Sequence, residues 1–142
     1  MTRFVIGPDV ALRMARERAA VPSEHELFAP TLMRSQLLAL LYRAFQGGEM
    51  DRGTADEHLD FVRGLRIRLL GDRVLQRVAW KVAERLGWSD TLDAEYVALT
   101  QLQADALVTL DARLAAAVAG EVAIAPYASL FDDSGRDPPC TD

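Results

Sequence analysis

Two aspartates in the C-terminal half of the sequence have the types and spacing needed for shared chemistry. Asp93 lies at the start of a predicted helix, and Asp111 directly follows a short apolar run, 106–110. If that run is a strand beside the helix, both carboxylates reach one end of a sheet. No cation nearby in the sequence pairs with them, and carboxylate oxygens are ligands that divalent cations prefer. The pair therefore suggests a divalent metal site.

A third aspartate is expected at the same edge. The apolar strand 3–7 ends at Gly7, and Pro8 and Asp9 then open a helix, where a fixed φ and an early carboxylate are both favourable. Functional groups gather beyond the carboxyl ends of parallel strands. Asp9 and Asp111 therefore converge if strands 3–7 and 106–110 are neighbours.

The remaining chain alternates between helical and strand-like patterns. Helices are predicted from Pro8, over about 32–46, from Thr54 as an N-cap with Glu57, over 72–86, over 93–103 and around 114–118. Strands are predicted at 3–7, 65–69, 106–110 and 122–124, while 27–30 is interpreted as the approach to the second helix. This alternation predicts an α/β fold with a mainly parallel sheet and helices on both faces.

Composition limits the class of protein. The chain has 142 residues, a formal net charge of −5 and one cysteine, Cys140. We expect one domain over residues 1–131 and a disordered polar tail over 132–142. One cysteine excludes an intramolecular disulfide and fits a reducing compartment. No apolar run approaches the ~20 residues of a membrane span, so we expect a soluble cytoplasmic protein.

The C-terminal pattern resembles a known family. The segment Leu92-Asp93-Ala94-Glu95-Tyr96-Val97-Ala98-Leu99, followed by Ala106-Leu107-Val108-Thr109-Leu110-Asp111, is similar to the C-terminal half of a PIN domain. It most resembles the VapC-type toxins of bacterial toxin–antitoxin pairs, over roughly residues 3–131. The resemblance implies a three-layer α/β fold with a central, mainly parallel sheet of about five short strands.

The resemblance also implies an activity. Family members are Mg²⁺- or Mn²⁺-dependent endoribonucleases in which acidic residues at four places bind the metal that activates a water. Asp93 matches the third acid, Asp111 the fourth, and Thr109 the hydroxyl residue usual just before the fourth. The partners implied are an RNA substrate, a cognate antitoxin that neutralises the enzyme, and a second copy in a homodimer.

The first two acidic positions depart from the family pattern. Gly7 stands where the first acid normally ends the first strand, and Asp9 follows two residues later. Gln36 stands after Arg34-Ser35, where the second acid is expected. We therefore assign Asp9, Asp93 and Asp111 as metal ligands and Gln36 as a catalytic residue that orients a water or the substrate. Asp90, near the start of the Asp93 helix, is a candidate replacement acid.

Other interpretations stay open from the sequence. Asp93 and Asp111 also suit helix starts for purely structural reasons. The missing acids fit a catalytically degenerate PIN domain that acts as a binding or regulatory module. A nuclease that acts on DNA or on structured RNA is a third possibility.

A basic run stands out in this acidic chain, namely Arg66, Arg68, Arg73, Arg77, Lys81 and Arg85. A solvated face explains most of it, and a few members are candidates to hold RNA phosphates. For Trp80 and Trp88 we expect core packing or a dimer contact rather than base stacking.

Overall fold

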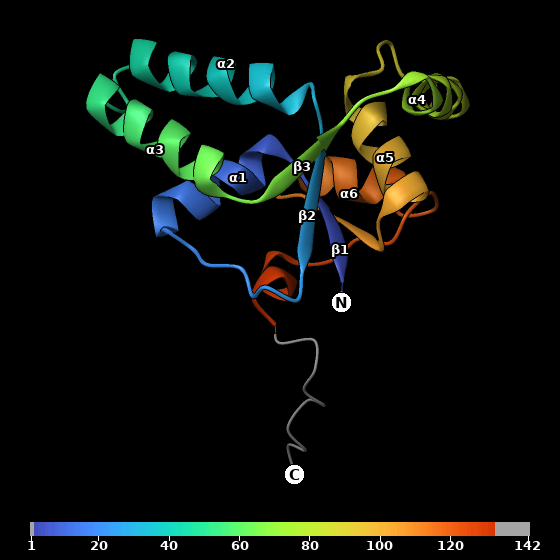
Figure 1. Cartoon of the computed structure of the whole chain (residues 1–142). Coiled ribbons are helices and arrows are strands. Elements are labelled where there is room, and N and C mark those ends of the chain that lie inside the picture. The colour runs from blue at the N-terminus through green and yellow to red at the C-terminus, as the bar shows by residue number, and fades with distance from the viewer. Residues whose placement is uncertain (1, 133–142) are drawn as a thin grey trace.

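A four-stranded parallel sheet forms the centre of the computed structural model, which describes residues 2–132 (Figure 1). The strands lie in the order β3-β2-β1-β4 and all run in the same direction. Their bounds are Arg3–Ile6 for β1, Glu26–Pro30 for β2, Ile67–Leu70 for β3 and Ala106–Val108 for β4. The predicted α/β class and the pairing of the first strand with β4 are confirmed. The sheet has four strands rather than five.

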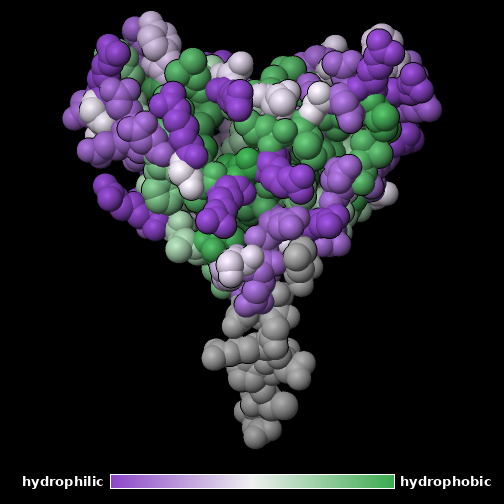
Figure 2. All heavy atoms as spheres, viewed as in Figure 1, coloured by the Kyte–Doolittle hydropathy of each residue, from purple (hydrophilic) through white to green (hydrophobic). Residues whose placement is uncertain are grey.

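Helices cover the sheet on both sides. In the first group, α1 (Pro8–Glu17), α2 (Met33–Gln46) and α3 (Arg52–Gly64) pack against one another. In the second group, α4 (Arg73–Leu86) packs along α5 (Leu92–Gln103). Figure 1 shows the two groups on opposite sides of the sheet. Helix α6 (Ala112–Val118) and the 3-10 helix η1 (Tyr127–Phe131) follow β4 in the sequence. The space-filling view shows the same arrangement as two lobes with a notch between them (Figure 2).

Helix α5 is the central element that fixes one side of the site. It contacts β1, β2, β4 and α4. Its residues 96–100 are all buried, so it is apolar on nearly every side, as expected for a helix enclosed by other elements. Because the body of α5 is held this firmly, Asp93 in its first turn has a fixed position relative to the strand ends.

Side-chain caps set the starts of α3 and α4, as well as that of α6. Asp72 accepts a hydrogen bond from the Leu75 N–H at 2.9 Å, which confirms the predicted start of α4. The prediction that Thr54 caps α3 is wrong. Asp51 is the cap, since its carboxylate accepts from the Thr54 N–H at 2.7 Å. The pattern of Thr54 and Glu57 resembled a capping box, but an equally good cap stood three residues earlier.

Four predictions about the strands need correction, and the first is that the strand predicted at 65–69 forms instead over Ile67–Leu70, as β3. The segment 27–30 belongs to β2, which pairs with both β1 and β3. It lacks the alternation of a half-buried strand because both of its faces are covered, so its pattern could not be separated from that of a buried helix. The predicted strand 122–124 is reduced to one parallel bridge, Leu107 to Ile124. The strand predicted at 106–110 ends at Val108, so Thr109 lies in the loop that follows.

Two further predictions concern the ends and the surface. The tail predicted over 132–142 lies outside the described residues except for Asp132. Among residues 2–132, no helix is long and apolar enough to cross a membrane.

Candidate functional site

A pocket of about 150 Å³ lies at the carboxyl ends of β1 and β4. Asp9, Gln36, Asp93, Thr109 and Asp111 all line it, as the sequence predicted. Its other lining residues are Gly7, Pro8, Tyr96, Leu107 and Leu114. The structure therefore brings together five predicted site residues that four separate segments of the chain supply.

Asp9 joins the start of α1 to the loop after β4. Its Oδ2 accepts hydrogen bonds from the Leu110 N–H at 3.0 Å and from the Thr109 hydroxyl at 3.4 Å. Its Oδ1 accepts from the Val10 N–H at 2.8 Å. Both oxygens of Asp9 therefore already accept hydrogen bonds within the protein. The carboxylate fixes the end of β1 relative to the end of β4.

Gly7 leaves the room that the Asp9 carboxylate occupies. A Cβ atom placed on Gly7 would lie 2.6 Å from Asp9 Oδ1 and 3.7 Å from Asp9 Cγ. The backbone of Gly7 has a φ of −82°, which any residue adopts, so space rather than conformation requires glycine there. The carboxylate of Asp9 thus turns back to the point where a side chain at position 7 would begin. The carboxylate of Asp9 therefore lies at the end of β1, although Asp9 itself is the second residue of α1.

Asp111 joins the pocket to the start of α6. Its Oδ1 accepts from the Arg113 N–H at 2.9 Å and from the Leu114 N–H at 3.2 Å, so it caps α6. Its own N–H donates to Thr109 Oγ1 at 3.1 Å. Within residues 2–132, the second oxygen, Oδ2, makes no hydrogen bond, which leaves it open to a ligand. Thr109 links Asp111 to Asp9 through its hydroxyl, a supporting position of the kind predicted.

Asp93 carries the clearest electrostatic signature of the site. Burial against the pocket raises the pKa of its carboxyl above the ordinary range, and the negative charges of Asp90, Asp111 and Asp9 raise it further. Within the described chain, no ion pair neutralises Asp93. A carboxylate that is surrounded by like charge is stabilised by any cation that enters the pocket.

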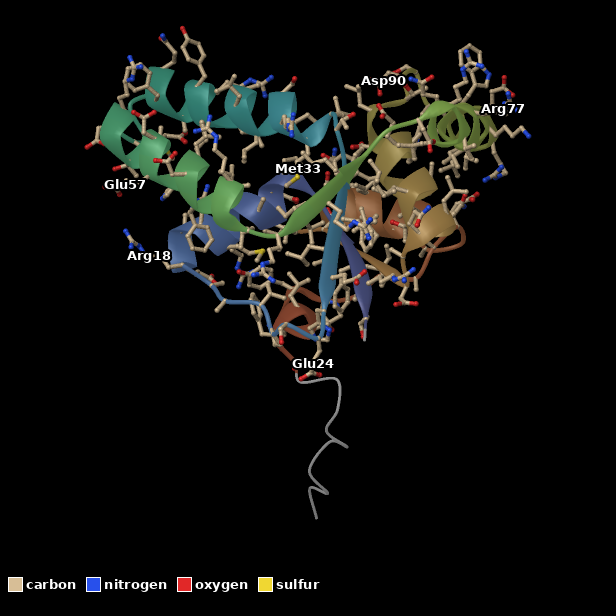
Figure 3. All side chains as sticks on the ribbon, viewed as in Figure 1. Arg18, Glu24, Met33, Glu57, Arg77 and Asp90 are labelled. Carbon is tan, nitrogen blue, oxygen red and sulfur yellow. The ribbon has the colours of Figure 1, made fainter. Side chains whose placement is uncertain are left out.

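Asp90 differs from the other predicted acids, because it does not line the pocket. Its Oδ1 accepts from the Leu92 N–H at 3.0 Å, and it lies in the loop before α5 (Figure 3). The structure therefore gives Asp90 a local structural contact and a charge that acts on Asp93. It does not bring Asp90 in as a further ligand.

Gln36 is held by a tyrosine that the sequence interpretation missed. The Tyr96 hydroxyl donates to Gln36 Oε1 at 2.6 Å. Burial raises the pKa of Tyr96 far above the ordinary range, and the charges of Asp9, Asp93 and Glu95 add to this effect. Tyr96 is therefore a neutral donor that turns the amide oxygen of Gln36 toward itself. The signal available in the sequence was its position three residues after Asp93, which places both on one helix face.

The donor set fits one hydrated divalent ion and not a complete protein cage. Mg²⁺ is commonly held by one or two carboxylates together with waters and substrate phosphates. Asp93 and the open oxygen of Asp111 supply two such ligands, and Asp9 adds negative charge. Among residues 2–132, no three His, Cys, Asp or Glu side chains are grouped closely enough to form a ready metal cluster. Any ion here is therefore held largely by water and substrate.

Comparison with known sequences gives no family assignment. A scan against models of protein families finds no match, and a search of curated proteins finds no significant match.

Comparison with solved structures shows a shared fold. The chain is similar to PAE2754 from Pyrobaculum aerophilum, known from a crystal structure, with a TM-score of 0.73 and 20% sequence identity. The match covers 91% of this chain and 92% of that one. The whole described architecture therefore recurs in another protein, and at this identity the likeness extends to the fold alone.

Proposed function

We propose that this chain is a Mg²⁺- or Mn²⁺-dependent endoribonuclease with a PIN-like fold of the VapC toxin type. One observation carries the proposal. The carboxylates of Asp9, Asp93 and Asp111 and the amide of Gln36 line a single pocket at the carboxyl edge of the sheet. The resemblance in the C-terminal sequence supports the same activity.

In this proposal Asp93 and Asp111 hold the ion. A bound divalent ion lowers the pKa of a coordinated water and neutralises charge on a phosphate. Asp93 favours cation entry because no ion pair within residues 2–132 neutralises its carboxylate and because the nearby charges of Asp90, Asp111 and Asp9 are also negative. Asp9, held by Thr109 and the Leu110 N–H, keeps the two strand ends in register around the pocket.

Gln36 has a different task from the aspartates. Because Tyr96 holds Oε1, the free end of the amide is its NH₂ group, which donates and cannot bind a cation. An amide donor beside three carboxylates suits a water or a phosphate oxygen. Gln36 therefore orients the substrate or the attacking water, and Tyr96 is the residue that positions it.

The test is cleavage of single-stranded RNA with Mg²⁺ or Mn²⁺ by the wild type and two variants. Asp93→Asn is expected to lower the rate by about 100-fold or more, because it removes charge at the reacting centre. Asp60→Asn, on the exposed surface of α3, is the control and should cleave as the wild type does. Equal rates in all three proteins would rule out the site.

The partners belong to the same proposal. A groove of about 600 Å³ between α2, α3 and β3 is mainly apolar and carries Arg34 and Arg63, features that suit a segment of a cognate antitoxin. On α2, the side chains of Leu38, Tyr42 and Phe45 are 58%, 59% and 41% exposed at helical spacing, as a homodimer contact would require. A small antitoxin-like reading frame beside this gene would support the toxin assignment.

The donor arrangement also favours a second candidate, a catalytically degenerate PIN domain that acts as a binding or regulatory module. Both oxygens of Asp9 hold donors within the protein, and Gln36 offers no charge. A degenerate domain of this kind would bind manganese no better in the wild type than in Asp111→Asn. Calorimetric titration of the two proteins distinguishes the candidates.

A further inference from the structure

The outer face of α4 presents three cations and an indole ring. Arg73, Arg77 and Lys81 recur every four residues and are all exposed. Trp80 lies among them on the same helix face, and its side chain is 63% exposed. The opposite face of α4 is buried through Leu75, Ala79, Val82 and Ala83. Figure 3 shows Arg77 projecting from the outer side of α4, away from the sheet.

These three cations are not used by the fold. Within residues 2–132, no ion pair joins Arg73, Arg77 or Lys81 to a carboxylate. Arg85, one turn further along, is different because two of its nitrogens donate to Glu121 at 2.8 and 2.6 Å. With a rise of 1.5 Å per residue, the three free cations stand about 6 Å apart along the helix axis. They form a row of unneutralised positive charge on an otherwise acidic protein.

Trp80 is fixed in this row without being buried. Its indole N–H donates to Glu84 Oε1 at 2.6 Å, so the polar edge of the ring has a partner within the helix. A large ring whose N–H is satisfied and whose surface faces solvent does not serve the core. Such a ring provides a platform for stacking.

We propose that this outer face of α4, the Arg73–Trp80–Lys81 face, binds single-stranded nucleic acid, with RNA as the partner. The cations contact phosphates and the indole stacks on an unpaired base, the combination by which proteins hold single strands without reading sequence. Bases in a duplex are already stacked and are not open to Trp80. The inference deepens the proposed function and rests on it for the choice of RNA. The exposure of Trp80 contradicts the expectation that it packs in the core, and the inference is an alternative to a dimer contact.

Charge argues against a second copy of the chain as the occupant. A two-fold dimer places the same patch on both sides of the interface. Arg73, Arg77 and Lys81 would then meet their own copies, which brings six cations together with few acids to offset them. A polyanion instead gains from the same arrangement.

The first test measures binding without cleavage. A fluorescein-labelled 12-nucleotide oligouridine is titrated in EDTA at several salt concentrations, and anisotropy reports the bound fraction. Arg77→Gln with Lys81→Gln should weaken binding by about tenfold. The slope of log affinity against log salt should fall by about 1.4, because each of the two phosphates that the variant no longer neutralises contributes about 0.7. Arg16→Gln with Arg43→Gln removes two exposed cations from α1 and α2 and is the matched control, expected to change neither value.

The second test isolates the indole. In a Trp88→Phe background Trp80 is the only tryptophan, and its fluorescence should be quenched as oligouridine binds. Trp80→Leu should weaken binding about fivefold or more, whereas Trp80→Phe, which keeps an aromatic face, should retain most of the affinity. A 12-base-pair RNA duplex should bind at least about tenfold more weakly than the single strand. Thermal melting should be unchanged in the Trp80, Arg77/Lys81 and Arg16/Arg43 variants, since these residues are exposed.

Several results would overturn the inference. Variants of α4 that bind as the Arg16/Arg43 control does would place the strand elsewhere. Trp80→Leu that dissociates a dimer in sedimentation without changing RNA affinity would make this face an interface between copies. Tighter binding of oligothymidine than of oligouridine would count against RNA. RNA binding by α4 without metal-dependent cleavage would support this inference and contradict the proposed nuclease activity. Cleavage at the wild-type rate by the α4 variants, with unchanged RNA affinity, would support the nuclease activity and contradict this inference.

Discussion

The two halves of the chain contribute to the pocket in different ways. The C-terminal half supplies Asp93 and Asp111, each with at least one part of its carboxylate available to a ligand. The N-terminal half supplies Asp9, whose two oxygens hold protein donors, and Gln36, whose oxygen holds Tyr96. The C-terminal carboxylates therefore keep oxygens free for a ligand, whereas the N-terminal side chains are taken up by hydrogen bonds within the protein. The hydrogen bonds of the N-terminal half hold the pocket in shape without a further charged ligand at Gly7 or Gln36.

The largest expected effect on stability comes from a substitution at Gly7, which lies against the Asp9 carboxylate of the N-terminal half. Gly7→Asp places a side chain 2.6 Å from Asp9 Oδ1 and adds a like charge, so we expect the free energy of unfolding to fall by about 2 kcal/mol or more. Urea denaturation measures the loss. In the double variant Gly7→Asp with Asp9→Ser the clash is absent, and it should be more stable than Gly7→Asp alone. A double variant whose loss equals the sum of the two single losses would show that the residues do not share this space.

Gln36→Glu is expected to make the N-terminal half contribute to cation binding and so to raise the affinity of the pocket for manganese. It adds a carboxylate to the pocket, and Tyr96 can still donate to it. Manganese affinity should rise by about tenfold, a change of ~1.4 kcal/mol in binding free energy. Tyr96→Phe in the wild type should leave manganese affinity nearly unchanged and lower the rate of RNA cleavage, because only the orientation of Gln36 is lost. Unchanged affinity in Gln36→Glu would mean that position 36 lies too far from the ion.

Asp111 and Asp93 should differ in what their side chains contribute to stability in the absence of metal. Asp111→Ala loses the cap of α6 and should reduce the free energy of unfolding by ~1 kcal/mol. Asp111→Asn, which can still cap, is the matched control and should lose little. Asp93→Asn relieves repulsion from its acidic neighbours and should not destabilise the protein. Chemical denaturation in EDTA compares the four proteins, and a clear loss in Asp93→Asn would contradict the electrostatic account.

The smallest effect is the pH dependence that Asp93 introduces. Its pKa is raised in the folded protein, so the folded state keeps this proton to a higher pH than the unfolded chain does. The stabilising contribution is complete below the ordinary aspartate pKa of ~3.9 and is lost as pH rises through the raised pKa. Asp93→Asn, which does not ionise, should therefore be more stable relative to the wild type at pH 7 than at pH 4. Unfolding curves at both pH values test this, and a difference of opposite sign would show that a cationic partner dominates instead.

The same contrast appears in what the sequence could predict. Around Asp93, Thr109 and Asp111 the predicted helix and strand are both present, and the structure places all three residues at one pocket. β2 was missed because a strand covered on both faces has no alternating pattern. The capping role of Asp51 was hidden because Thr54 offered an equally plausible start. Local pattern therefore failed at β2, where an apolar run gave no period, and at the start of α3, where two caps competed.

The sequence predicted which residues line the pocket better than it predicted how their side chains are arranged there. That Asp9 turns back over Gly7 depends on a backbone path and a side-chain rotamer, neither of which spacing encodes. The bond from Tyr96 to Gln36 joins residues 60 positions apart, so no local pattern reveals it. The exposure of Trp80 likewise depends on which face of α4 packs against α5. Each of these features needed the tertiary arrangement.

The most direct test of the central claim, that the carboxylates of this pocket hold a divalent ion, is calorimetric titration with manganese. The wild type should bind one ion with a dissociation constant of ~1 mM or tighter. Asp93→Asn should abolish that binding, while Asp60→Asn on α3 should leave it intact. Binding of equal strength in the wild type and Asp93→Asn, or no binding by the wild type, would contradict the account.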